Sequence, residues 1–175
     1  LGEKNSSQSH LIDINVASKA EVNHGLIAFG CDGNSNLLNN TFIRQSVNSK
    51  YSFSALQTGW YLSRLEPNIL QKNGNAETSI KILQVVKNND QIATHTLVRF
   101  NGPNGRLNQL QKAIADNNSH SIFNGIIEVP EIAQKTEAAQ LSRNILLSKR
   151  AQIDTKPELE IIADDVRCTH GATVS

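Results

Sequence analysis

The amino-acid sequence predicts an all-β protein, and three observations lead to that prediction. Several short segments place apolar or β-branched residues at every second position, which is the period of a strand with one buried face. These segments recur at fairly even spacing along the chain. Many of the breaks between them contain Asn or Gly, and 20 of the 175 residues are Asn. Both residue types tolerate the left-handed backbone conformation that tight turns require.

The expected strands follow one another along most of the chain. In order they are residues 11–16, 41–47, 51–58, 78–86, 94–100, 121–129 and 159–162. The first alternates apolar and polar side chains, and residues 94–100 have β-branched or aromatic residues at every second position. The expected turns are Gly33-Asn34, Asn73-Gly74, Asn104-Gly105, Asp116-Asn117 and Asn124-Gly125.

One segment opposes the all-β prediction. Residues 133–148 place Ala138, Leu141 and Ile145 at helical spacing, with good helix formers between them. Taken alone, this pattern predicts a helix. The β-rich surroundings argue against it, because tertiary context often overrides local propensity.

Three all-β architectures are compatible with this pattern: a sandwich, a closed barrel and a parallel β-helix. A sandwich normally joins its strands by hairpin turns of about two to five residues, and only some of the breaks are that compact. The abundance of Asn favours a β-helix, in which amide side chains can hydrogen-bond from coil to coil. No clean fixed-period repeat adds support, so the residues alone leave all three open.

Length and composition restrict the function. A chain of 175 residues fits one domain, 1–175, and a net charge of +1 without a basic stripe argues against nucleic acid as a partner. The longest apolar runs are a few residues long, far short of the roughly 20 that a membrane helix needs, so a soluble intracellular protein is expected. The two cysteines, Cys31 and Cys168, are expected to be free thiols. The chain lacks Met and begins at Leu1, which suggests a fragment.

The strongest candidate for chemistry is the pair Cys168 and His170. They are two residues apart, so on a strand both side chains project from the same face. A thiolate and a neutral imidazole are suitable ligands for iron or zinc, and Gly171 permits a close backbone approach. Two ligands complete no tetrahedral site, however. On spacing alone, a buried and purely structural Cys168 is the better interpretation.

Two enzymatic interpretations are weaker. A thiol nucleophile at Cys168 would need an aimed base and a third orienting group, which adjacent side chains on one strand rarely provide. A carbohydrate-cleaving β-helix would need paired carboxylates. Asp164 and Asp165 are consecutive, so in an extended segment they point to opposite faces, and a solvated turn is the expected role for at least one of them.

A family resemblance is more specific than these patterns. The blocks that carry it, in order, are Phe123-Asn124-Gly125, residues 133–138, Arg143-Asn144-Ile145-Leu146-Leu147-Ser148, residues 156–161, Ala163-Asp164-Asp165-Val166 and Cys168-Thr169-His170-Gly171-Ala172-Thr173. Together they closely resemble the signature of the SufB/SufD family of iron–sulfur cluster assembly proteins. The likeness covers the last two-thirds of the chain, and the joined motif from Lys156-Pro157 to Gly171 is similar to the SufD branch.

The resemblance implies a right-handed parallel β-helix, with residues 133–148 in its coils and helical regions flanking it in full-length members. It implies a non-enzymatic scaffold subunit of a SufBCD complex, which pairs with SufB through its last coils. The SufC ATPase would dock on a region beyond Ser175. A homodimer is a further expectation for the isolated chain, and the compartment would be the cytoplasm or the plastid stroma.

The same resemblance assigns the metal site. His170 is expected as a ligand to a transient iron–sulfur cluster shared with SufB, with Cys168 beside it as a second ligand or as a structural or iron-handling thiol. The chain alone is expected to hold no cluster. The alternative is a β-helix that acts only as an interaction module, with Cys168 and His170 packed and no metal ligand role.

Overall fold

The computed structural model describes residues 5–31 and 34–175, and within these ranges all regular structure is β-strand. None of the described residues forms a helix that could span a membrane. The strands are β1 (Ser7–Val16), β2 (Glu21–Phe29), β3 (Asn36–Gln45), β4 (Lys50–Thr58), β5 (Leu62–Gln71), β6 (Glu77–Val86), β7 (Gln91–Phe100), β8 (Arg106–Ala115), β9 (His120–Val129), β10 (Glu137–Leu146), β11 (Gln152–Ile161) and β12 (Arg167–Val174).

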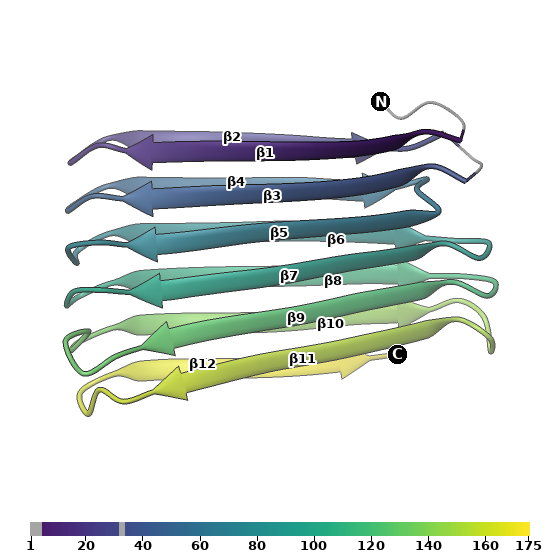
Figure 1. The fold of residues 1–175 in the computed structure, drawn as a ribbon. Helices are drawn as coiled ribbons and strands as arrows, with labels where there is room; N and C mark the ends of the chain where they lie inside the picture. Colours follow the sequence, from purple (N-terminus) through teal and green to yellow (C-terminus); the bar gives the residue numbers. More distant parts are fainter. Residues whose placement is uncertain (1–4, 32–33) are drawn as a thin grey trace.

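The strands form two parallel sheets that lie face to face (Figure 1). One sheet has the order β1-β3-β5-β7-β9-β11, and the other has the order β2-β4-β6-β8-β10-β12. The chain therefore crosses from one sheet to the other at each turn and advances by one strand in each sheet per coil, winding in the right-handed sense (Figure 1). The predicted right-handed parallel β-helix is confirmed, which excludes the sandwich and the barrel.

The coil length explains why the repeat is hard to see in the sequence. In the odd-numbered sheet the strands begin at residues 7, 36, 62, 91, 120 and 152, so most steps are 29 residues but two differ by three. The turns absorb the difference. On one side of the solenoid the chain turns into the even-numbered strands. From β2 to β10, each of these turns has a residue with a positive φ two positions before the strand begins: Lys19, Asn48, Asn75, Asn104 and Lys135. Asn suits this position because it tolerates the left-handed region.

Three of the predicted turns are confirmed and one is wrong. Asn73-Gly74, Asn104-Gly105 and Asp116-Asn117 lie between strands, while Gly33 is outside the described residues. Asn124-Gly125 is wrong as a turn, because it lies in the middle of β9. Gly125 faces the interior, where a Cβ atom would stand 2.3 Å from Nε2 of Gln140 and 2.5 Å from Phe123. It is there to leave room for a side chain rather than to turn the backbone.

The interior combines an apolar core with buried amides. Fully buried apolar side chains include Ile43, Tyr51, Phe53, Leu65, Ile80, Val98, Phe100 and Ile127. Between them lie the buried glutamines Gln45, Gln57, Gln71, Gln84, Gln109, Gln111 and Gln140. Several of these join coils: Gln57 Nε2, for example, donates to Thr94 Oγ1 at 2.9 Å. Coil-to-coil amide bonding is therefore mostly a role of Gln, whereas much of the Asn enrichment serves the turns.

The helix that local propensity predicts over residues 133–148 does not form, and the family resemblance is correct here. Residues 137–146 are β10, in which Ala138, Gln140, Ser142 and Asn144 point inward at strand spacing. Both neighbours of β10 are strands, so its backbone groups are paired on two sides by β8 and β12. Ladder bonds and burial outweigh the local preference for helix.

Candidate functional site

Strand β12 brings Cys168 and His170 to the same face. In its parallel pairing with β10, Cys168 lies opposite Ala138 and His170 lies opposite Gln140. Ala138 and Gln140 are both buried in the interior. Because directly paired residues of a parallel ladder point the same way, Cys168 and His170 project from the inner face of the last coil.

The two side chains differ in burial. Cys168 is partly buried and packs against the main hydrophobic core, whereas His170 is exposed. Both β11 and β12 are the last strands of their sheets (Figure 1), so within the described residues no further coil covers this end. Burial raises the pKa of the Cys168 thiol, and a hydrogen bond with the Ala138 backbone opposes that rise. His170 is thus the more accessible donor of the pair.

None of the described residues brings a third strong ligand to this pair. Within residues 5–31 and 34–175, no group of three or more His, Cys, Asp or Glu side chains is arranged to hold a metal ion. Cys31 is exposed between β2 and β3, at the opposite end of the stack of coils. Asp164 and Asp165 are exposed in the loop before β12, as the sequence predicts for a solvated turn. A thiol and an imidazole together form half of a first coordination sphere.

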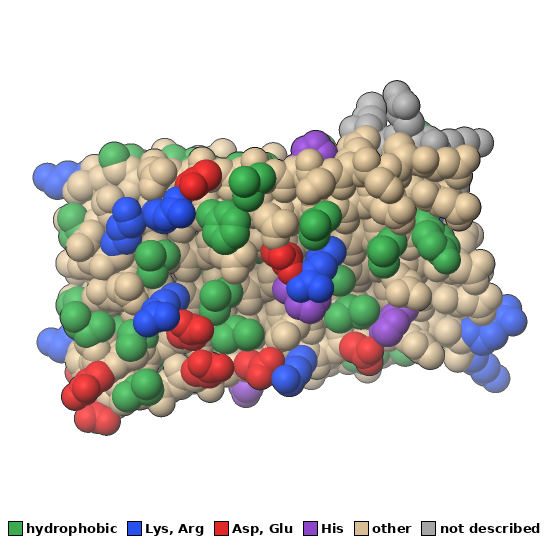
Figure 2. Space-filling view, in the orientation of Figure 1, with side chains coloured by type: hydrophobic (Ala, Val, Ile, Leu, Met, Phe, Trp, Pro, Cys, Tyr) green, Lys and Arg blue, Asp and Glu red, His purple; other side chains and the backbone are tan. Residues whose placement is uncertain are grey.

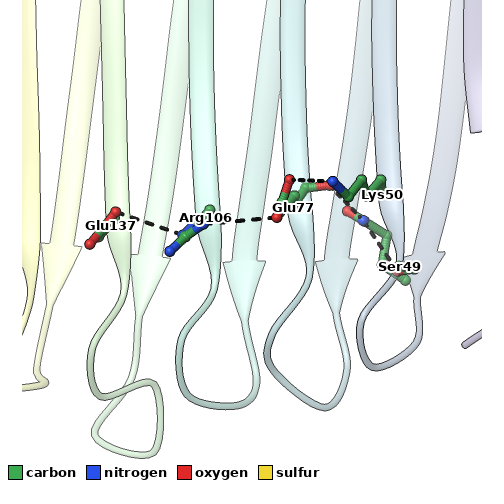
Figure 3. A network of polar contacts seen from close by, with 6 residues as sticks. Ser49, Lys50, Glu77, Arg106 and Glu137 are labelled. Carbon is green, nitrogen blue, oxygen red and sulfur yellow. Dashed lines mark hydrogen bonds and ion pairs between the residues drawn. The ribbon is translucent and has the colours of Figure 1, made fainter. Parts of the chain in front are cut away.

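A row of alternating charges crosses the outer face of the sheet that contains β12. Each even-numbered strand contributes one residue, and the paired positions are Glu21, Lys50, Glu77, Arg106, Glu137 and Arg167. Lys50 Nζ lies 3.3 Å from Glu77, and Arg106 lies 3.9 Å from Glu77 and 3.7 Å from Glu137 (Figure 3). This charge row lines a groove of about 550 Å³. Each charge therefore faces opposite charges on the neighbouring strands, which favours the observed stacking of coils.

Between the two sheets, a chain of hydrogen-bonded polar side chains ends beneath the Cys168–His170 pair. Gln109 Nε2 donates to Thr96 Oγ1 at 2.8 Å, and Gln140 Nε2 donates to Gln109 Oε1 at 3.1 Å. Gln140 is 2% exposed, and its Oε1 has no hydrogen-bond partner among the described residues. Sequence reasoning missed Gln140 because it assigned helical spacing to this segment. The alternation of Ala138, Gln140 and Ser142 would have revealed it.

The opposite sheet presents a face of mixed character. In Figure 2, acidic and basic side chains are interspersed with apolar ones, and acidic groups gather toward the last coils. These include Asp154, Glu158 and Glu160 on β11. His120 Nε2 lies 2.7 Å from Asp154, so this imidazole already has a carboxylate partner on the outer face. The described basic side chains on this face form no stripe that could follow a phosphate backbone.

The chain is similar to known proteins over most of its length. Residues 2–175 match the model of a family described as SUF system FeS cluster assembly, SufBD core domain. The chain is 40% identical over 135 residues to an iron-sulfur cluster assembly SufBD family protein of Synechocystis, covering 77% of this chain and 30% of that protein. It is 36% identical over 136 residues to the chloroplastic protein ABCI7 of Arabidopsis thaliana, covering 77% and 29%.

A third relative covers more of the chain. The iron-sulfur cluster assembly protein SufD of Escherichia coli is 35% identical over 162 residues, which is 92% of this chain and 38% of that protein. The chain therefore spans about a third of the length of these curated relatives.

Proposed function

The chain belongs to the SufBD core family of the SUF system for iron–sulfur cluster assembly, and from that premise we propose that it is the β-helical core of a scaffold subunit. In this proposal the protein itself catalyses no reaction. It presents His170, with Cys168 beside it, to a nascent iron–sulfur cluster that is shared with a SufB partner. The cluster is the cargo of the assembly.

One observation carries the proposal: a thiol and an imidazole project from the inner face of the terminal strand, at a coil end that no described residue covers. Sulfur and imidazole nitrogen are the donors found in iron–sulfur and mixed Cys/His sites. A cluster needs about four protein ligands, and this chain supplies two. The remaining ligands would come from the partner across the interface.

The edge of β12 supports pairing with a partner strand. β12 is bonded to β10 on one side, and its other edge carries backbone donors and acceptors with no paired strand among the described residues. Such an edge is a template for strand addition. In our proposal SufB extends the sheets here, while the SufC ATPase contacts a region of the full-length protein outside these 175 residues. The isolated chain would use the same edge to form a homodimer.

The deciding experiment uses the full-length protein co-expressed with SufB and SufC and reconstituted anaerobically with iron and sulfide. We expect His170→Ala to leave the complex intact by size-exclusion chromatography and to lower its bound iron and sulfide sharply. Thr169→Ala is the matched control, because Thr169 lies between the two donors on β12 but points to the outer face. Wild-type iron and sulfide content in the His170→Ala complex would overturn the ligand role.

A second function remains a candidate because Cys168 packs against the core and its thiol pKa is raised by burial. In that case the last coil would serve only as an interaction surface. The same experiment separates the two: an interaction module predicts normal cluster content in both Cys168→Ala and His170→Ala complexes. The names of the relatives place such proteins in bacteria and chloroplasts, so the proposed compartment is the cytoplasm or the plastid stroma.

A further inference from the structure

The buried amide chain in the last coils has a direction. Thr96 on β7 accepts from Gln109 on β8, and Gln109 in turn accepts from Gln140 on β10. Gln109 donates across the interior to the facing sheet, and Gln140 Nε2 donates to the preceding strand of its own sheet. In a planar amide the oxygen and the nitrogen are bonded to the same carbon in different directions, so a glutamine whose Nε2 is held by the preceding strand leaves its Oε1 available for another donor.

The forward oxygen of Gln140 is the open end of this chain. Its Oε1 is buried and has no partner among the described residues, while its Nε2 is bonded to Gln109. A buried carbonyl without a donor costs about 1–3 kcal/mol, so a donor on the next coil would be stabilising. The residue paired with Gln140 on that coil is His170.

Space for this arrangement is provided by glycine on the facing sheet. Gly125 on β9 points inward, and a Cβ atom there would stand 2.3 Å from Nε2 and 3.0 Å from the side-chain carbonyl carbon of Gln140. The amide of Gln140 therefore occupies a slot between the sheets. The slot confines the amide and limits its freedom to turn Oε1 away from β12.

We propose that Gln140 is a positioning residue for His170: the imidazole, which makes no such bond in this structure, turns toward β10 so that its Nδ1–H donates to Oε1 of Gln140. Adjacent strands of a sheet are about 4.8 Å apart, and Nδ1 is the ring nitrogen nearer the backbone, so it is the one within reach of a side chain on β10. Nδ1 then carries the proton, and Nε2 keeps its lone pair for a ligand outside the coil. This inference rests on the proposed function for the identity of that ligand, but not for the hydrogen bond itself.

The hydrogen bond has a chemical purpose. A neutral imidazole exists as two tautomers, and a metal-ligating histidine normally donates its other N–H to a fixed acceptor. An exposed histidine without such an acceptor samples both tautomers and several ring orientations. The amide chain would thus prepare His170 before a cluster arrives, using groups held rigid by the interior of the solenoid.

The test measures the tautomer directly. The full-length protein is labelled with ¹⁵N-histidine, and the ring nitrogens of His170 are assigned by their loss in His170→Ala. At a pH where the ring is neutral, we expect the wild-type spectrum to show a protonated Nδ1 and an unprotonated Nε2. Gln140→Met keeps the length of the side chain but removes the acceptor, so His170 should shift toward the Nε2–H tautomer.

Two further variants make the result specific. Gln111→Met is the matched control, because Gln111 is equally buried in the same sheet but pairs with Ser142 and has no hydrogen bond on either amide atom; it should leave the His170 signals unchanged. Gln140→Glu restores an acceptor and should restore the Nδ1–H tautomer. This variant also keeps the test open if Gln140→Met does not fold.

The outcomes separate this inference from the proposed function. The role of Gln140 is overturned if His170 favours the Nε2–H tautomer in the wild type, or if its tautomer is the same in Gln140→Met as in the wild type. Either result would count against Gln140 whatever the cluster content. A tautomer shift in Gln140→Met supports that role even if His170→Ala complexes assemble clusters normally. In the latter case only the ligand assignment fails.

Discussion

Reversing the charge of Arg106 should destabilise the solenoid in a salt-dependent way. Arg106 lies between Glu77 and Glu137 at 3.9 and 3.7 Å, and the three side chains are 63%, 45% and 59% exposed. Exposed pairs contribute roughly 0.2–1 kcal/mol each. Arg106→Glu removes two such pairs and sets three carboxylates side by side on adjacent strands, where like charges are destabilising. We expect the free energy of unfolding to fall by about 1–2 kcal/mol at low ionic strength.

Urea denaturation followed by circular dichroism measures this change, and the comparison is repeated at ~1 M NaCl, where the screening length falls to about 3 Å. Most of the loss should disappear there. Lys112→Glu is the matched control, since Lys112 lies on the same face of β8 but pairs with Leu83 and Arg143. It should change stability by less than about 0.5 kcal/mol. The role of the charge row (Figure 3) would be refuted if both charge reversals lowered the free energy of unfolding equally. It would also be refuted if salt did not reduce the loss caused by Arg106→Glu.

Three other substitutions test the packing of the coils. Burial lowers the pKa of His24 from its usual 6.5, so below about pH 6.5 the unfolded state binds more protons than the folded state. Stability should therefore decrease as the pH is lowered, and the urea midpoint of His24→Gln should depend less on pH than that of the wild type. Ile127 is fully buried, and Ile127→Ala should cost about 2–5 kcal/mol in urea unfolding. Gly59 has a φ of +73°, and a Cβ there would stand 2.4 Å from the carbonyl oxygen of Gly30. Gly59→Ala should therefore lower the melting temperature clearly, whereas Gly25→Ala, with open space around it, should not.

A strand is easiest to predict from the sequence where its inner face is apolar. Residues 51–58 are a good example, because Tyr51, Phe53 and Ala55 are all buried and β4 is predicted almost to its ends. Strand β8 was not predicted. Its inner face carries Gln109 and Gln111, while Leu110 points outward, so the hydrophobic pattern is blurred. An interior built partly from amides removes the contrast on which strand prediction depends.

The candidate site shows a similar division. Strand alternation puts Cys168 and His170 on one face from sequence alone, because it needs only the local backbone. Gln140 could not be placed beneath His170 in that way. His170, which pairs with Gln140, lies 30 residues later in the chain, and the register between β10 and β12 depends on the length of the loop after β11. Coil lengths that vary between steps hide such pairs from a search for a fixed repeat.

The geometry of a solenoid supports the ligand role that we propose for the pair on the last described coil. An inward side chain in an inner coil is covered by the coils on both sides, as shown by Ala138 at 4% and Gln140 at 2% exposure. Such a side chain has no room for a metal and its partner ligands. Along the stack, the inward side chains of β12 are covered by β10 on one side and by no described residue on the other, so Cys168 rests on the core while His170 is exposed. A second β-helix that abuts this end would enclose the pair and add its own donors. It follows that His170→Ala should alter cluster binding while costing little stability, because an exposed side chain contributes little to folding.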